Sequence, residues 1–205
     1  MAWRTLLASL LVLVAGTVAL ALATDDFRAY TTEGARRLEV ARHPRSLPEA
    51  RLQTAAGGIT DLDGLRGRWL LVDFIYTRCM TYCAMQGQGF ARLQRELAPQ
   101  LAAGQVVLLS LSFDPGRDGP AELAAYQRRL GGTTGAGWLA ARPAGAEELA
   151  TLMRAFGVVA LDDGFGGFVH NAAINVVDPE GRLVAVLDQD ALDEARDFVL
   201  ARLGS

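Results

Sequence analysis

The sequence predicts an α/β domain with a central mixed sheet flanked by helices. The main reason is that strand patterns alternate with helix patterns along most of the chain. Continuous apolar runs at 68–76 and 105–113 are typical of central strands that are buried on both faces. Between these runs, apolar residues recur at helical spacing over 83–102. The chain has 205 residues, 51% of them hydrophobic, which is enough for one domain with a substantial core.

The remaining elements are predicted in order from their boundary residues. A short hairpin with a Gly-Gly turn is expected over 51–67. A helix with proline in its first turn follows the second strand over 120–130, and a helix closed by glycine is expected over 145–157. A hairpin over 172–187 and an amphipathic helix over 190–203 complete the domain. A late hairpin followed by a terminal helix is the order of a thioredoxin-like fold.

The N-terminal segment predicts export. Residues 5–24 form an uncharged, largely apolar run that is long enough to cross a bilayer. Arg4 precedes this run and two aspartates follow it, which favours a cytoplasmic N-terminus with the domain outside. We therefore predict that residues 1–24 are a membrane anchor and that the domain faces the bacterial periplasm. The alternative is a signal peptide that is cleaved near Ala23.

The sequence divides into three segments. After the anchor or signal peptide at 1–24, residues 25–46 are charged and lack a sustained apolar period, so we predict a linker there. The folded domain is expected over 47–205. The net charge of −3 does not favour a nucleic-acid surface, which needs clustered basic residues in excess.

Both cysteines lie in one short stretch, FIYTRCMTYCAMQ at 74–86. Cys79 and Cys83 follow the first buried strand directly and lead into the first long helix. The carboxyl end of a central strand is where α/β sheets place their ligand sites. A helix N-terminus also lowers the pKa of a thiol and so favours the thiolate. Thiolate is the form that metal binding and disulfide exchange both need.

The spacing of the two cysteines leaves several interpretations open. Three residues separate them, one more than in a C-x-x-C redox motif. The wider loop lets both sulfur atoms point at one ion, and a disulfide remains geometrically possible. Soft thiolates select Cu(I) and Zn among common metals. A purely structural disulfide would close a short loop and stabilise weakly, and inert unpaired cysteines are a further alternative.

Three stretches together resemble one family of copper proteins. DFIYTRCMTYC, SLSFDPGRDGPAELAAYQRRLG and FVHNAAINVVDPEGRLVAVL are similar, in order and spacing, to the Sco/SenC family, from about Leu47 to the C-terminus. The resemblance implies a thioredoxin-like domain that binds copper through Cys79, Cys83 and His170. It also implies a role in cytochrome c oxidase assembly, with the copper-accepting subunit of a respiratory oxidase or another exported copper enzyme as partner.

The chain departs from the family pattern next to each cysteine. Met80 and Ala84 occupy positions where the family commonly has proline, which frees backbone N–H groups and loosens the loop. The departure removes no ligand, but it raises the question of which target this member serves. Met80 and Met85 carry thioethers, which are soft copper ligands, although ordinary packing also accounts for them.

His170 follows a glycine-rich loop and precedes a strand. From the sequence alone, a single histidine at such a place is more often an ordinary surface or edge residue, whereas the resemblance implies a ligand. A neutral imidazole with two thiolates makes a soft three-coordinate site that suits Cu(I). The comparable loop of disulfide-exchanging proteins carries a cis-proline, and here no proline is present, which favours metal binding by analogy.

Four other polar residues are candidates for a place in or near the site. Asp73 lies inside a buried strand, where a carboxylate needs a partner or a raised pKa. Asp114 and Asp118 are accounted for by a turn and a helix start, with Asp118 near the N-cap. Asp114 is also a candidate for a residue that contacts the metal ligands without binding the metal. His43 is expected to be solvated in the linker.

The leading hypothesis is a copper metallochaperone, which is not an enzyme in the ordinary sense. The alternative is a membrane-attached thiol–disulfide oxidoreductase that uses Cys79 and Cys83 to keep the cysteines of a copper site reduced. A peroxide-reducing enzyme of the same fold, or a domain that has lost its site and acts as a binding module, are further alternatives. These hypotheses differ in their need for His170, because disulfide exchange requires only the two sulfur atoms.

Overall fold

An eight-stranded mixed sheet forms the centre of the computed structural model, which describes residues 2–79, 82–133 and 137–204, with the backbone alone over 82–86. Its strands are β1 (Arg45–Ser46), β2 (Arg51–Thr54), β3 (Ile59–Asp61), β4 (Trp69–Ile75), β5 (Val106–Ser112), β6 (Trp138–Pro143), β9 (Ala173–Val177) and β10 (Arg182–Asp188). They are arranged in the order β1-β10-β9-β4-β5-β6-β2-β3. The β4–β5 and β5–β6 pairs are parallel, and the other pairs are antiparallel. The predicted mixed sheet is confirmed.

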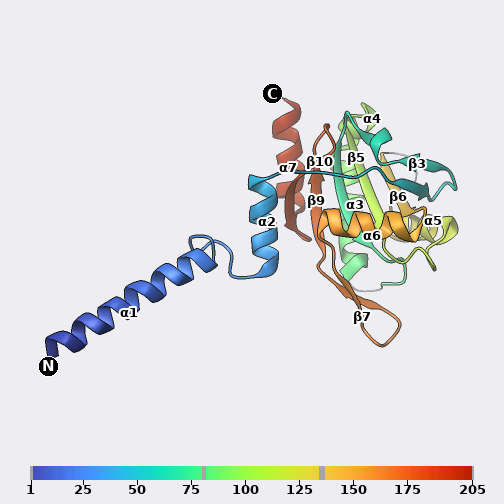
Figure 1. Ribbon diagram of the computed structural model, residues 1–205. Helices are drawn as coiled ribbons and strands as arrows, with labels where there is room; N and C mark the ends of the chain where they lie inside the picture. Colours follow the sequence, from blue (N-terminus) through green and yellow to red (C-terminus); the bar gives the residue numbers. More distant parts are fainter. Residues whose placement is uncertain (1, 80–81, 134–136, 205) are drawn as a thin grey trace.

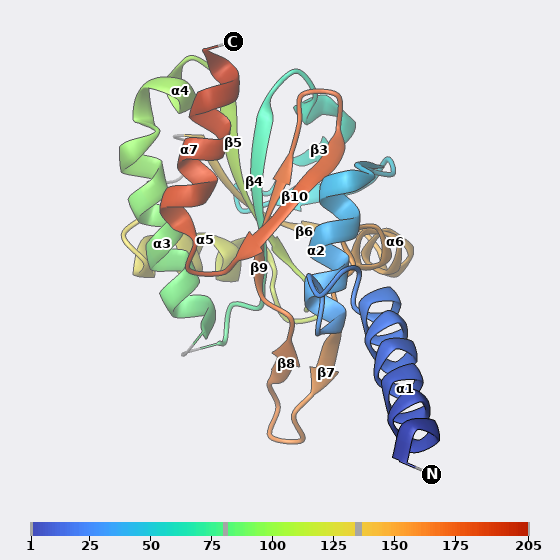
Figure 2. The ribbon, with the colours of Figure 1, turned by 90° about the vertical axis from the view of Figure 1, so that its left-hand side faces the viewer.

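Helices cover both faces of this sheet. The helical elements of the domain are α2 (Thr32–Arg42), the 3-10 turn η1 (Asp63–Leu65), α3 (Tyr82–Glu96), α4 (Ala98–Ala102), α5 (Pro120–Arg129), α6 (Ala146–Phe156) and α7 (Leu192–Leu203). Figure 1 gives the arrangement, and Figure 2 shows α3, α4 and α7 on one side of the sheet with α2 and α6 on the other. The predicted α/β architecture is therefore confirmed, with one hydrophobic core on each face.

The central strand β4 is buried along its whole length, as predicted. Because side chains alternate along a strand, Leu70 and Phe74 enter the core under α6, and Leu71 and Ile75 enter the core under α3. The parallel neighbour β5 is also buried throughout. The ends of β4 and β5 thus point the same way and bring the segments that follow them to one edge of the sheet.

Helix α2 lies within 25–46, where the sequence analysis expects a linker. Its N-cap is Thr31, whose hydroxyl accepts a hydrogen bond from the Gly34 amide at 2.9 Å. The helix packs along β10, and its Val40 side chain has no exposed surface. Val40 is the buried residue of this helix, so the segment has no sustained apolar period that could reveal it in the sequence.

A second, two-stranded sheet extends from the main body. It consists of β7 (Ala160–Asp162) and β8 (Phe168–His170), and His170 pairs with Ala160 at its base. Gly164 and Gly166 at its tip have φ angles of 75° and 86°, which glycine adopts readily. Figure 2 shows this hairpin below the sheet, continuing into β9.

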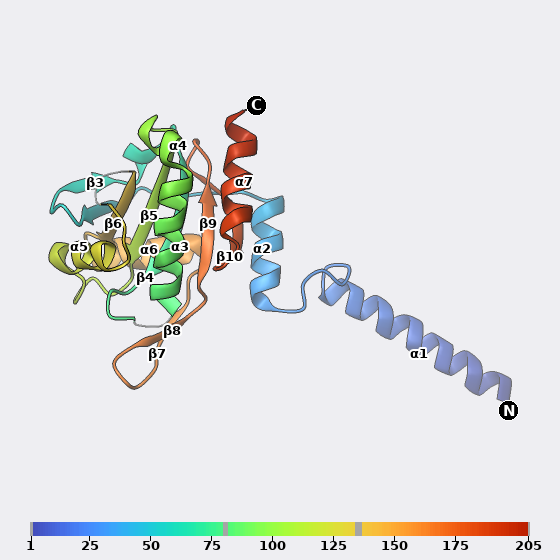
Figure 3. The ribbon, with the colours of Figure 1, turned by 180° about the vertical axis from the view of Figure 1, so that it is seen from behind.

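The N-terminal helix α1 (Ala2–Ala23) projects away from the domain, as Figure 1 and Figure 3 show. Its apolar side chains are largely exposed. It is long and apolar enough to cross a membrane, and a signal sequence has the same properties. The structure therefore agrees with the predicted apolar helix and is compatible with either an anchor or a cleaved segment.

Candidate metal centre

Cys79 lies in the loop that follows the buried strand β4. Its amide donates a hydrogen bond to the Tyr76 carbonyl at 3.1 Å, which turns the chain, and its side chain is 6% exposed. Helix α3 begins at Tyr82, so Cys83 is in the first turn of a helix, as predicted. Met80 lies outside the described residues, as do the side chains of Cys83, Ala84 and Met85.

A buried carboxylate fixes the start of the cysteine loop. Asp118 accepts hydrogen bonds from the Thr77 amide at 2.9 Å, the Thr77 hydroxyl at 2.6 Å and the Ser112 hydroxyl at 2.6 Å. It has no exposed surface, so these bonds are shielded from water. Arg129 adds a bond to the Thr77 carbonyl at 2.8 Å. The segment two residues before Cys79 is thereby tied to β5 and α5.

Asp118 lies near the N-cap of α5, as the sequence predicts, but the sequence does not predict these hydrogen bonds. The N-cap of α5 is Gly119, and Asp118 turns instead toward the ends of β4 and β5. The D-P-x-R-D pattern was the available signal, but its spacing alone does not tell which segment the second aspartate reaches. Asp114, the first aspartate, forms ion pairs with Arg78 at 3.4 Å and Arg117 at 3.5 Å.

His170 is the last residue of β8 and lies in an aromatic cluster. Its ring centroid is 5.0 Å from that of Phe113. Phe113 also contacts Tyr76 at 5.5 Å and Phe168 at 5.4 Å between centroids. Because Tyr76 and Phe113 belong to the same buried cluster as Cys79, these rings join the cysteine loop to the hairpin that carries the histidine.

Cys79 and His170 line one cavity of about 520 Å³. Tyr76 and Phe168 supply apolar walls, and Asp163 and Asp188 lie at its polar margin. The structure therefore brings together two of the three predicted ligands, from segments 91 positions apart in the sequence (170 − 79). Within the described ranges, no group of three metal-ligating side chains is present, and the third predicted ligand, Cys83, has its side chain outside them.

The chemistry of the described donors fits a soft metal ion. Burial lowers the pKa of His170, which favours the neutral imidazole that coordinates metals. Imidazole nitrogen and thiolate sulfur are donors that suit Cu(I) and Zn. The other histidine, His43, is exposed at the C-terminal end of α2 and takes no part in this cavity.

Asp73 is buried in β4 with no exposed surface. Neither of its carboxyl oxygens forms a hydrogen bond with the parts of the chain that the structure describes. Burial raises the pKa of Asp73 to about 7, because removal from water disfavours the charged carboxylate. Of the two solutions that the sequence analysis allows, the burial of the unpaired carboxyl group favours the raised pKa.

Solved structures of several Sco proteins are similar to this chain. Bradyrhizobium japonicum ScoI with copper bound is 22% identical, with a TM-score of 0.65, over 76% of this chain and 98% of that one. A SCO1/SenC family lipoprotein from Bacillus anthracis is 20% identical, with a TM-score of 0.70, over 80% and 99%. BsSco, described as a member of the Sco family of cytochrome c oxidase assembly proteins with a disulfide switch, is 20% identical, with a TM-score of 0.67, over 78% and 94%.

These likenesses confirm the thioredoxin-like fold that the sequence predicts. A search of curated protein sequences found no match. The family model described as SCO1/SenC matches residues 46–202, which includes β4, both cysteines and His170. The match covers well over half of the chain, and the chain therefore belongs to the SCO1/SenC family.

Proposed function

We propose that this protein is a copper metallochaperone. The observation that carries the proposal is the cavity shared by Cys79 and His170, next to the helix start that bears Cys83. These three residues would hold one copper ion as cargo. The copper-bound state of the related ScoI supports the choice of metal.

The surroundings of the site suit the binding and release of a cuprous ion. The thiols lose their protons when they bind the metal, and the N-terminal end of α3 favours the resulting charge. The Tyr76, Phe113 and Phe168 rings limit access of water to the ligands. The cavity is not fully enclosed, so thiolates of a partner could replace the ligands one at a time.

We propose a copper-accepting subunit of a respiratory oxidase as the recipient. The assembly role in the description of BsSco supports this choice, and another exported copper enzyme is the alternative. Helix α1 would hold the domain on the periplasmic side of the inner membrane, or would be removed near Ala23 after export. The division into 1–24, 25–46 and 47–205 stays a prediction.

Anaerobic Cu(I) titration of the full chain in detergent tests the metal site. We expect one ion per chain, lost in the Cys79→Ser/Cys83→Ser double variant. We expect His170→Ala to weaken binding by more than about 100-fold, because loss of an outer-shell partner already costs about 10–100-fold. His43→Ala is the matched control and should bind as the wild type does. Normal affinity in His170→Ala would show that the site is assigned wrongly.

A second candidate is a thiol–disulfide oxidoreductase, favoured by the closeness of the two cysteines in the chain. In that reaction Cys79 and Cys83 would be oxidised to a disulfide while a partner disulfide is reduced to two thiols. The reaction does not need an imidazole ligand. Reduction of a partner disulfide by His170→Ala at the wild-type rate, together with weak copper binding by the wild type, would favour this candidate.

A further inference from the structure

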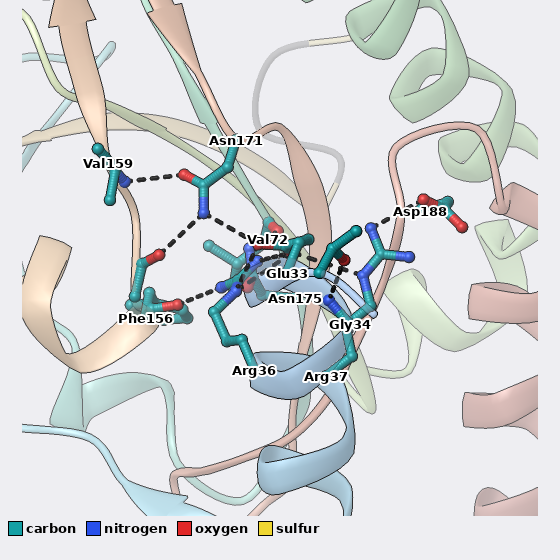
Figure 4. A network of polar contacts seen from close by, with 12 residues as sticks. Glu33, Gly34, Arg36, Arg37, Val72, Phe156, Val159, Asn171, Asn175 and Asp188 are labelled. Carbon is teal, nitrogen blue, oxygen red and sulfur yellow. Dashed lines mark hydrogen bonds and ion pairs between the residues drawn. The ribbon is translucent and has the colours of Figure 1, made fainter. Parts of the chain in front are cut away.

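The membrane-proximal helix α2 is bonded to the residue that follows His170. The side-chain nitrogen of Asn171 donates a hydrogen bond to the Glu33 carboxylate at 3.2 Å, across 138 positions of sequence. Figure 4 shows this contact at the centre of a polar network between α2 and the His170 hairpin. A bond to an ionised acceptor is stronger than one between neutral groups, so this contact can hold α2 to the hairpin.

Asn171 also closes the base of the hairpin. Its side-chain oxygen accepts a hydrogen bond from the Val159 amide at 2.8 Å, and its side-chain nitrogen donates to the Gly157 carbonyl at 3.0 Å. Gly157 and Val159 precede β7, and Asn171 follows β8. One side chain therefore ties the entry of the hairpin to its exit, directly beside His170.

Two arginines of α2, Arg36 and Arg37, form ion pairs with Glu33 and hold it in place. Arg36 bonds to Glu33 and to the Phe156 carbonyl at the end of α6, and its side chain is only 10% exposed. Arg37 forms an ion pair with Asp188 at 2.8 Å, and Asp188 lines the same cavity as His170. Helix α2 is thus attached to the base of the hairpin through Asn171 and to a residue that lines the cavity through Asp188.

We propose that α2 positions His170 for metal binding, with Glu33 acting through Asn171. The proposal rests on the proposed copper site. The hairpin extends from the main body, and its glycine-rich tip adds little rigidity, so its base determines where the imidazole lies. A metal ligand has to be held within a fraction of an ångström of its position. The Glu33–Asn171 contact and the bonds at the hairpin base would hold the imidazole in this way.

The arrangement also links the metal site to the membrane side of the chain. Helix α2 begins nine residues after α1 ends (32 − 23) and stays with the domain if the chain is cleaved near Ala23. Because coupling between two equilibria is reciprocal, copper binding should in turn strengthen the docking of α2. A disturbance of α2 at the membrane would reach the site through Glu33.

The test measures Cu(I) affinity of the full chain by competition with a colorimetric Cu(I) chelator. We expect Asn171→Ala to weaken binding by about 10–100-fold, as is usual for groups that orient a ligand. The isosteric Glu33→Gln should weaken it by about 3–10-fold. Glu39→Gln is the matched control, since Glu39 lies on the same helix but pairs with Arg45, and its affinity should equal that of the wild type.

The same substitutions in a His170→Ala background separate positioning from general damage. If Asn171 acts through His170, then Asn171→Ala should cause no further loss there. For the Cu(II) form, nitrogen hyperfine coupling in the electron paramagnetic resonance spectrum should be altered by Asn171→Ala and unchanged by Glu39→Gln. Circular dichroism checks that each variant is folded.

The outcomes distinguish the two proposals. Wild-type affinity in His170→Ala would overturn the proposed site itself. A strong effect of His170→Ala with wild-type binding by Asn171→Ala and Glu33→Gln would overturn the positioning role alone. Equal losses from Asn171→Ala in both backgrounds would also overturn it, because the residue would then act on the fold and not through the imidazole.

Discussion

At the scale of single residues, Asp73 imposes a pH dependence on stability. Its pKa is raised by burial from the ordinary 3.8 to about 7 in the folded state. Between these values the unfolded chain has lost this proton while the folded chain keeps it, so the contribution of Asp73 to stability falls as pH rises. Above about pH 7 the folded protein carries a buried charge, and the full cost is present.

Asp73→Asn should remove this dependence. From pH 4 to pH 7, the wild type should lose stability relative to Asp73→Asn, so the unfolding free energy of the variant minus that of the wild type should rise. The largest change expected in this free-energy difference is about 4 kcal/mol, from a pKa difference of about 3 units at 1.36 kcal/mol per unit. Urea unfolding at several pH values measures it. Carboxylates with lowered pKa, such as Asp163, affect both proteins equally and cancel in the difference. A difference that does not change with pH would contradict the raised pKa.

At the scale of elements, α2 belongs to the folded unit although its sequence is mostly polar. Val40, with no exposed surface, anchors it in the core beneath α6, and the ion pair from Arg37 to Asp188 adds to the contact with β10. The short strand β1 then continues the chain along β10. The part of the chain between α1 and the central strands therefore contains a packed helix.

Val40→Ala should destabilise the protein by about 2 kcal/mol, because it leaves a cavity under α2. The effect should appear locally as well, as faster hydrogen exchange of the α2 amides than of the β4 amides. Val169→Ala is the matched control, since Val169 is 66% exposed and should change stability by less than about 0.5 kcal/mol. Unchanged exchange in α2 would mean that Val40 does not hold the helix to the domain.

At the scale of the whole molecule, the parts that the sequence predicts correctly are those with strong local patterns. The runs that became β4 and β5 are apolar throughout, and the placement of Cys79 and Cys83 follows from the strand before them and the helix after them. The parts that it does not predict depend on contacts between distant segments. Asp118 reaches Thr77 across 41 positions, and Glu33 reaches Asn171 across 138.

The three proposed ligands come from separate elements, so copper bound by them should stabilise the whole fold. Cys79 follows β4, Cys83 lies in the first turn of α3 and His170 ends β8, and unfolding would separate His170 from the two cysteines. A ligand at 100 times its Kd stabilises the folded state by about 2.7 kcal/mol. For a protein of this size, each kcal/mol raises the Tm by about 2–4 °C.

Anaerobic calorimetry of the full chain should therefore show a rise in Tm of about 5–10 °C when Cu(I) is held near 100 times its Kd. The rise should be abolished in Cys79→Ser/Cys83→Ser and much smaller in His170→Ala at the same metal concentration, because that variant binds more weakly. His43→Ala should behave as the wild type. If Cu(I) bound tightly without raising the Tm, the ligands would have to lie within one segment that stays together on unfolding, and His170 would not be among them.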